Sequence, residues 1–89
     1  MNALELKDLC SSWDGSSDAF AEIVTEALDV LGVYQHDLAR EFEVAESTVS
    51  RWAHGVARPH PRAQKQIVRA IKKRAGRSSQ SLAPEALHP

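Results

Sequence analysis

Residues 35–55 read QHDLAREFEVAESTVSRWAHG, and this stretch decides the fold. It divides into two helix-length pieces, residues 35–42 and residues 46–54, which a short turn at residues 43–45 connects. Helices of this length are marginal in isolation, because nucleation costs more than a few backbone hydrogen bonds return. The stretch therefore predicts two short helices that pack on each other and on the rest of the chain.

Apolar residues mark one side of each of these two helices. Leu38, Ala39 and Phe42 share a face of the first helix. On the second helix Val49 and Trp52 stand three residues apart, which is the spacing of neighbours on a helix surface. The small side chain of Ala39 allows the two helices to cross closely. The other side of the second helix is polar and carries Ser47, Ser50, Arg51 and His54.

A short helix with this polar side suits the major groove of DNA. There an arginine can reach both acceptors of a guanine, and small hydroxyl groups fit the groove floor. We therefore predict a helix-turn-helix whose second helix contacts bases. The predicted base contacts occupy the exposed side at its start and middle: Glu46, Ser47, Ser50 and Arg51. Glu46 can accept a hydrogen bond from a cytosine amino group, or it can act by rejecting other sites.

A longer run, LGVYQHDLAREFEVAESTVSRWAHGVARP at residues 31–59, combines these features at a defined spacing. Its features are Gln35 opening the first helix, Leu38 and Ala39 within it, Val44 in the turn, STVSRW at residues 47–52, Gly55, and Arg58 with Pro59. This combination resembles the phage-repressor and Cro-like (Xre-type) helix-turn-helix family.

The resemblance implies an all-α, lambda-repressor-like helical bundle. It also implies a sequence-specific DNA-binding regulator of transcription, commonly a repressor, whose partner is double-stranded DNA. The phosphate contacts implied by the resemblance come from the polar and cationic residues Gln35, Thr48, His54, Arg58 and Arg62.

The sequence departs from the family pattern at three positions. Tyr34 stands where the family has threonine or serine, Glu43 where it has glycine, and Ala45 where it has a serine or threonine cap. Losing a glycine at a turn position with positive φ costs on the order of 1 kcal/mol, and losing a cap costs about as much. We expect the fold to tolerate these costs.

The distribution of charge separates the chain into an acidic and a basic part. The net charge is −1, but residues 1–50 contain eleven acidic and two basic side chains. Residues 51–77 contain nine Lys or Arg and no acid. This pattern predicts a basic face, which begins inside the helix-turn-helix and suits nucleic acid. The alternative is a pair of solvated faces that neutralise one another within or between subunits.

Three further helices are predicted. An apolar stripe at Leu6, Leu9, Cys10 and Trp13 predicts a helix within residues 2–13, which either covers the core or contributes to a dimer contact. A helix over residues 18–31 has an inner face of Phe20, Ile23, Val24, Ala27, Leu28 and Leu31. Its acidic side holds Asp18, Glu22, Glu26 and Asp29, which are either solvated or face a protein partner. Ser16 or Ser17 caps this helix and Gly32 ends it.

The last predicted helix starts at Pro61 and runs to about residue 75, with Gly76 ending it. Its expected inner residues are Ala63, Ile67, Ala70 and Ile71. Its outer cations are Arg62, Lys65, Arg69, Lys72 and Lys73. The predicted organisation is an N-terminal helical extension at residues 1–17, a helix-turn-helix domain at residues 18–76, and a disordered tail at residues 77–89.

Composition argues against several other classes of protein. No segment is long and apolar enough to span a membrane, and the acidic N-terminus does not read as a secretory signal. The single Cys10 cannot form an internal disulfide, which favours a reducing cytoplasm. A DNA-bound form is expected to associate with the nucleoid. The four histidines lack metal-ligand spacing, and the isolated glycines form no phosphate loop. We expect no metal, no cofactor and no enzymatic activity.

Two other functions stay open at this level. One is an antitoxin-like or phage accessory protein, which binds DNA and also a protein partner through the acidic face of residues 18–31. The other is a protein-interaction module on the same fold that has lost DNA binding, which the acids around the turn allow. A single helix-turn-helix reads few base pairs, so a DNA-binding form is expected to be a homodimer. The last helix, the N-terminal stripe or the DNA itself could supply the dimer contact.

Overall fold

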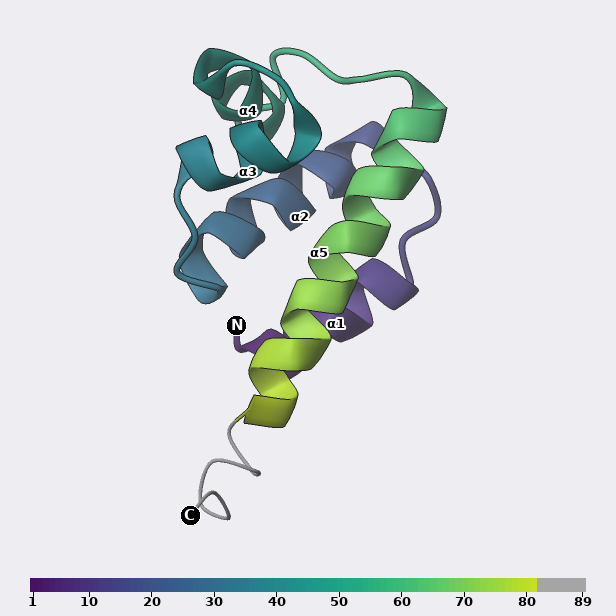
Figure 1. Cartoon of the computed structure of the whole chain (residues 1–89). Helices are drawn as coiled ribbons and strands as arrows, with labels where there is room; N and C mark the ends of the chain where they lie inside the picture. The colour runs from purple at the N-terminus through teal and green to yellow at the C-terminus, as the bar shows by residue number, and fades with distance from the viewer. Residues whose placement is uncertain (82–89) are drawn as a thin grey trace.

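The computed structural model describes the backbone of residues 1–81 and the side chains of residues 1–78. Within that part of the chain it contains five helices and no strand, so the all-α prediction is confirmed (Figure 1). The helices are α1 (Ala3–Ser11), α2 (Ser17–Val30), α3 (Gln35–Phe42), α4 (Glu46–Ala53) and α5 (Pro61–Ser81). The predicted bounds of the two short helices differ from the observed ones only at residue 54, because His54 forms the C-cap of α4.

Local side-chain chemistry explains where the first two helices begin and end. Asn2 and Glu5 form a reciprocal capping box at α1, with nitrogen–oxygen distances of 2.8 and 3.1 Å. Ser16 caps α2 as predicted, since its Oγ accepts a hydrogen bond from the Ala19 backbone N–H at 3.2 Å. Gly32 follows the end of α2 with a φ of 64° and turns the chain away from the helix axis.

A single hydrophobic core joins all five helices. α5 packs along α1 and also against α2, while α4 packs against α2 and α3 (Figure 1). The buried apolar side chains are Leu6, Cys10, Phe20, Ile23, Val24, Ala27, Leu38, Ala39, Val49, Trp52, Ile67, Val68, Ile71 and Ala75. In this arrangement α2 lies between two pairs, α1 with α5 and α3 with α4.

The N-terminal stripe lies in this core. Leu6 is fully buried and Cys10 is 6% exposed, while Leu9 and Trp13 are half-buried at its edge. The Trp13 ring contacts Phe20 of α2, with ring centroids 6.5 Å apart. Of the two roles predicted for this stripe, the structure therefore shows the core role.

The predicted end of the last helix is wrong. Gly76 was expected to end it, but α5 continues through Gly76 to Ser81. Gly76 does not adopt a positive φ, and the aliphatic chain of Lys7 on α1 passes over it, 4.0 Å from where a β-carbon would lie. Packing against α1 thus compensates for the roughly 1 kcal/mol that a glycine costs inside a helix. Residues 77–81 are helical, whereas residues 82–89 of the predicted tail lie outside the described residues.

The inner face of α5 differs slightly from the predicted one. Ile67 and Ile71 are buried as expected, but Ala63 and Ala70 are only half-buried. Within residues 1–81, none of the helices combines the length and apolar character that crossing a lipid bilayer requires.

Candidate nucleic-acid interface

The turn between α3 and α4 reverses the chain through one left-handed residue. Glu43 has φ 56° and ψ 47°, which is the position where a glycine was expected from the family pattern. The Val44 N–H donates to the Ala39 carbonyl at 2.9 Å and so closes the end of α3. Ala45 occupies the N-cap of α4, and no side chain caps that helix. The conformation of this turn therefore follows from backbone hydrogen bonds.

Three contacts fix the orientation of α4 against the rest of the protein. Val49 is fully buried and Trp52 is 5% exposed. The Trp52 ring packs against Phe20 of α2 and Phe42 of α3, with centroid distances of 6.1 and 6.4 Å. The Thr25 hydroxyl on α2 lies 2.9 Å from the Ala53 carbonyl at the C-terminal end of α4 and 2.9 Å from the Ala21 carbonyl of its own helix, so its one proton is shared between two acceptors. No sequence pattern indicated this role for Thr25, because its partner on α4 depends on how the helices cross.

The predicted base-contacting residues form the outward side of α4. Glu46, Ser47 and Arg51 are exposed, and Ser50 is half-buried. Among the residues whose side chains the structure describes, Arg51 has no ion-pair partner, so Glu46 does not neutralise it. The guanidinium is consequently available to an external acceptor.

The residues predicted to contact phosphate are distributed over three elements. Gln35 at the start of α3 and Thr48 in α4 are half-buried. His54, Arg58 and Arg62 are exposed at the end of α4, in the following loop and in the first turn of α5. In sequence, these residues precede α4, lie within it and follow it.

The hydrogen bond of His54 limits its predicted role. Its Nδ1 lies 2.7 Å from the Ser50 carbonyl and donates to it, because a carbonyl can only accept. In the neutral ring Nε2 is then an acceptor, which cannot donate to a phosphate oxygen. His54 can therefore contact phosphate only as the imidazolium ion.

The loop after α4 is held at both ends. The Val56 and Ala57 N–H groups donate to the Arg51 carbonyl at 3.0 and 3.4 Å. At the other end the buried Gln64 donates from Nε2 to the Pro59 carbonyl at 2.9 Å. These bonds hold the backbone on both sides of Arg58, and sequence reasoning missed the role of Gln64.

An ionic and aromatic cluster lies beside Glu46 at the start of α3. The rings of Tyr34 and His36 stack with centroids 5.5 Å apart and an interplanar angle of 9°. His36 lies between two carboxylates, with Nε2 3.4 Å from Asp37 Oδ1 and Nδ1 3.9 Å from Glu46 Oε1. The cluster links the N-terminal ends of α3 and α4. No sequence motif pointed to it, since Tyr34 is a departure from the family pattern.

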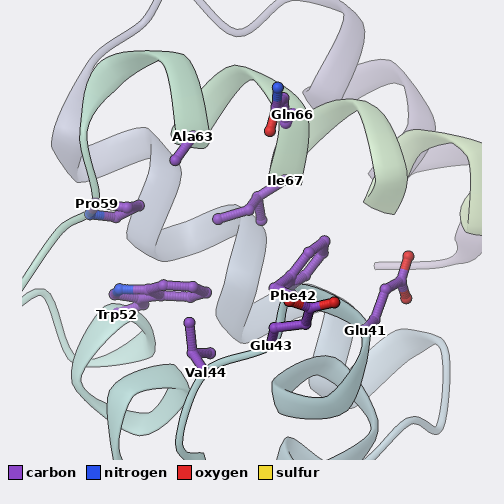
Figure 2. A pocket seen from close by; sticks show the side chains of 9 residues that line it. All are labelled: Glu41, Phe42, Glu43, Val44, Trp52, Pro59, Ala63, Gln66 and Ile67. Atoms are coloured by element: carbon purple, nitrogen blue, oxygen red, sulfur yellow. The ribbon is translucent and has the colours of Figure 1, made fainter.

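A second feature is an apolar groove between the α3–α4 turn and α5, with a cavity volume of about 310 Å³. Phe42, Trp52 and Ile67 face this groove, and Glu43 lies at its edge (Figure 2). Beside the groove, the Arg74 guanidinium of α5 forms an ion pair with Glu41 of α3, with Nε 2.8 Å from Oε1.

The acidic residues of α2 are mostly exposed. Asp18, Glu22 and Asp29 are exposed, and Glu26 is half-buried. Among residues 1–81, no three His, Cys, Asp or Glu side chains come together as a possible metal site.

Comparison with protein-family models, with curated proteins and with solved structures finds no match to this chain.

Proposed function

We propose that this protein is a sequence-specific, duplex-DNA-binding regulator of transcription. In this proposal α3 and α4 act as the helix-turn-helix of a lambda-repressor-like bundle, and α4 enters the major groove. The observation that supports it best is the outward side of α4. There Arg51, which has no ion-pair partner among residues 1–78, stands among small hydroxyl groups on a helix that Val49 and Trp52 anchor in the core.

The dimensions of α4 support this proposal. With its side chains a helix is about 10–12 Å in diameter, which fits the roughly 12 Å width of the major groove, and the eight residues of α4 make a helix about 12 Å long to lie in it. Ser47 and Ser50 have short side chains, so the backbone of α4 can come close to the base edges. The arginine fork can then donate to O6 and N7 of one guanine.

The loop and the start of α5 would supply contacts with the DNA backbone. Arg58 and Arg62 are exposed, and the hydrogen bonds at both ends of the loop limit its freedom. Such contacts fix the register of the protein without reading sequence. Gln35 and Thr48 would add neutral hydrogen bonds at the ends of α3 and α4.

We further propose that the protein binds its operator as a homodimer. One α4 reads only a few base pairs, whereas two copies related by a two-fold axis double the information. Their half-sites are then expected about 34–36 Å apart, one turn of DNA. Sedimentation with and without the operator measures this, and a strict 1:1 complex on a non-palindromic site would contradict it.

The test is selection of bound duplexes from a random pool, followed by titration at several salt concentrations. We expect an enriched motif containing at least one guanine. The affinity should fall by roughly 0.9 log units per phosphate contact for each log unit of salt. Arg58→Ala should lower that slope by about one contact and weaken all sequences alike.

The matched control removes an exposed cation elsewhere. Arg77→Ala changes the charge by the same amount at the far end of α5, and we expect a smaller change in slope. Equal slopes for wild type and Arg58→Ala would show that the loop does not touch the backbone. A selected pool without an enriched motif would contradict sequence-specific binding.

A second candidate function is recognition of a protein, and the apolar groove of Figure 2 supports it. Its exposed Glu43 complements a partner segment in which an apolar residue stands next to Lys or Arg. A gel shift with random duplex at low salt separates the two functions. Protein recognition would be favoured if the duplex gave no gel shift and a peptide with adjacent basic and apolar residues bound saturably. Glu43→Lys should then abolish binding of the peptide.

A further inference from the structure

A groove lies between α5 and the C-terminal end of α1. These two helices pack side by side (Figure 1). The cavity volume of the groove is about 240 Å³. The half-buried Trp13 and the buried Val68 are among its apolar lining residues. Three cations of α5 complete the lining: Lys65, Arg69 and Lys72.

No protein group compensates the charge of these three cations. Lys65, Arg69 and Lys72 are all exposed, and none has an ion-pair partner among residues 1–78. No carboxylate lines the groove. α5 contains no acidic residue, and Lys7 of α1 adds a further cation where it crosses Gly76. The groove therefore attracts anions.

The spacing of the cations defines the kind of anion. Lys65 and Lys72 stand seven residues apart, which is about 10 Å along a helix, with Arg69 between them. One strand of duplex DNA presents a phosphate every 3.4 Å or so along its axis, and hence about three phosphates over this length. The row of cations therefore matches the backbone of one DNA strand.

We propose that the α1–α5 groove binds the phosphate backbone of a second DNA duplex, without reading its bases. The inference rests on the proposed function, in which α4 holds the first duplex. The groove contains no residue of α4, so α4 stays free for the first duplex and one protein would link two DNA segments.

An acidic protein surface fits this groove less well than DNA does. An acidic helix offers about one carboxylate per turn, and each exposed ion pair contributes less than about 1 kcal/mol. DNA offers a denser row of charge, and its binding also releases condensed counterions.

The test is capture of a second duplex by a first. A duplex that carries the selected motif, about three helical turns long, is fixed to beads, and a fluorescent duplex of unrelated sequence is added with the full-length protein. Two double variants are compared. The groove variant carries Lys65→Gln and Lys72→Gln, and the control variant carries Lys73→Gln and Arg77→Gln elsewhere on α5. The second pair lines a different cavity, beside Glu41, and removes the same charge.

We expect the groove variant to capture about tenfold less fluorescent duplex, because two phosphate contacts are lost. The control variant should change capture by less than about twofold, and both should bind the fixed duplex within about threefold of wild type. Circular dichroism confirms that both variants fold, which is expected for exposed positions.

Several results would overturn the proposal. Capture that both variants reduce equally would show a general effect of charge. Capture that the groove variant retains would mean that a dimer links the duplexes through two copies of α4. A groove variant that loses self-association without DNA would make this face a protein interface. Failure of the proposed function looks different, because binding of the fixed duplex would then be insensitive to its motif and to Arg51→Ala.

Discussion

The two sides of α4 differ in what surrounds them. On the inward side Val49 and Trp52 are buried, with aromatic rings from α2 and α3 against the indole. On the outward side Ser47 and Arg51 are exposed, and Arg51 has no ion-pair partner within residues 1–78. The inward side is saturated with protein contacts, whereas the outward side has almost none.

This contrast separates folding from binding within one short helix. Substitutions on the inward side should lower the free energy of unfolding, because they remove packed apolar surface. Substitutions on the outward side should leave it nearly unchanged, since exposed side chains without partners contribute little. Any effect they have on DNA affinity then reflects direct contact.

The largest effect is expected for Trp52→Ala. The substitution leaves a cavity between Phe20 and Phe42, and truncations of this kind cost about 3–5 kcal/mol. A domain of this size has a total stability of the order of 5–15 kcal/mol, so the variant is expected to be partly or fully unfolded. Urea titration followed by circular dichroism measures the loss. A loss below about 1 kcal/mol would contradict the packing of α4 described above.

A buried group outside α4, Cys10 of α1, gives a pH-dependent test of the same core. Burial raises the pKa of the Cys10 thiol from 9.0 to about 11, and the Lys72 ammonium partly opposes this shift. As the pH rises, the thiol of the unfolded chain ionises first. The contribution of the neutral thiol to the free energy of unfolding is therefore fully present below pH 9.0. It is lost as the pH approaches about 11. A pKa shift of this size corresponds to about 2–3 kcal/mol in the free energy of unfolding.

Because lysines titrate in the same range, the Cys10 contribution is measured as a difference. Urea titrations at about pH 8 and about pH 11 on the wild type and Cys10→Ala provide it. The wild type should lose about 2–3 kcal/mol more than the variant over this range. Parallel losses would show that the thiol is accessible to solvent.

On the outward side the largest expected effect is that of Arg51→Ala. Under the proposed function it should weaken binding of the cognate site by about 1–3 kcal/mol and relax the preference at one guanine. Arg51→Lys should restore only part of this, since an ammonium lacks the bidentate fork. The free energy of unfolding should change by less than about 0.5 kcal/mol in both variants.

Titration against the site and its single-base versions at that position measures the Arg51 contact. Equal losses on all four bases would make Arg51 a phosphate contact. An unchanged affinity would leave it a solvated side chain and would remove the main support for base reading by α4.

Sequence patterns predicted most of the helices because local signals and apolar spacing agreed. Ser16 capped α2 and Gly32 ended it, and the apolar pair Val49 and Trp52 faced inward as its spacing indicated. The end of α5 was not predictable, since Gly76 is a helix stop in isolation. Only the packing of Lys7 over it, which depends on α1 lying beside α5, shows why the helix continues.

The residue types of the candidate site and the side of α4 that they occupy were predictable from the sequence. The hydrogen bonds around them were not. The exposure of Glu46, Ser47 and Arg51 followed from helix periodicity. The hydrogen bonds of Thr25 and His54 depend on where carbonyl groups lie after folding, which no sequence spacing reports.

The smallest effect concerns the turn that connects α3 to α4. Glu43 has a φ of 56°, a left-handed conformation that costs a residue with a β-carbon about 1–2 kcal/mol. Glu43→Gly relieves that cost, although the more flexible unfolded chain offsets part of the gain, so a net stabilisation of about 0.5–1 kcal/mol is expected. Glu43→Ala is the matched control, because it removes the same carboxylate and keeps the unfavourable φ. Urea titration of both variants should show stabilisation by glycine and little change with alanine. Equal stabilisation would assign the effect to charge repulsion among the acids near the turn, and destabilisation by glycine would show that the Glu43 side chain contributes packing to the groove beside Phe42.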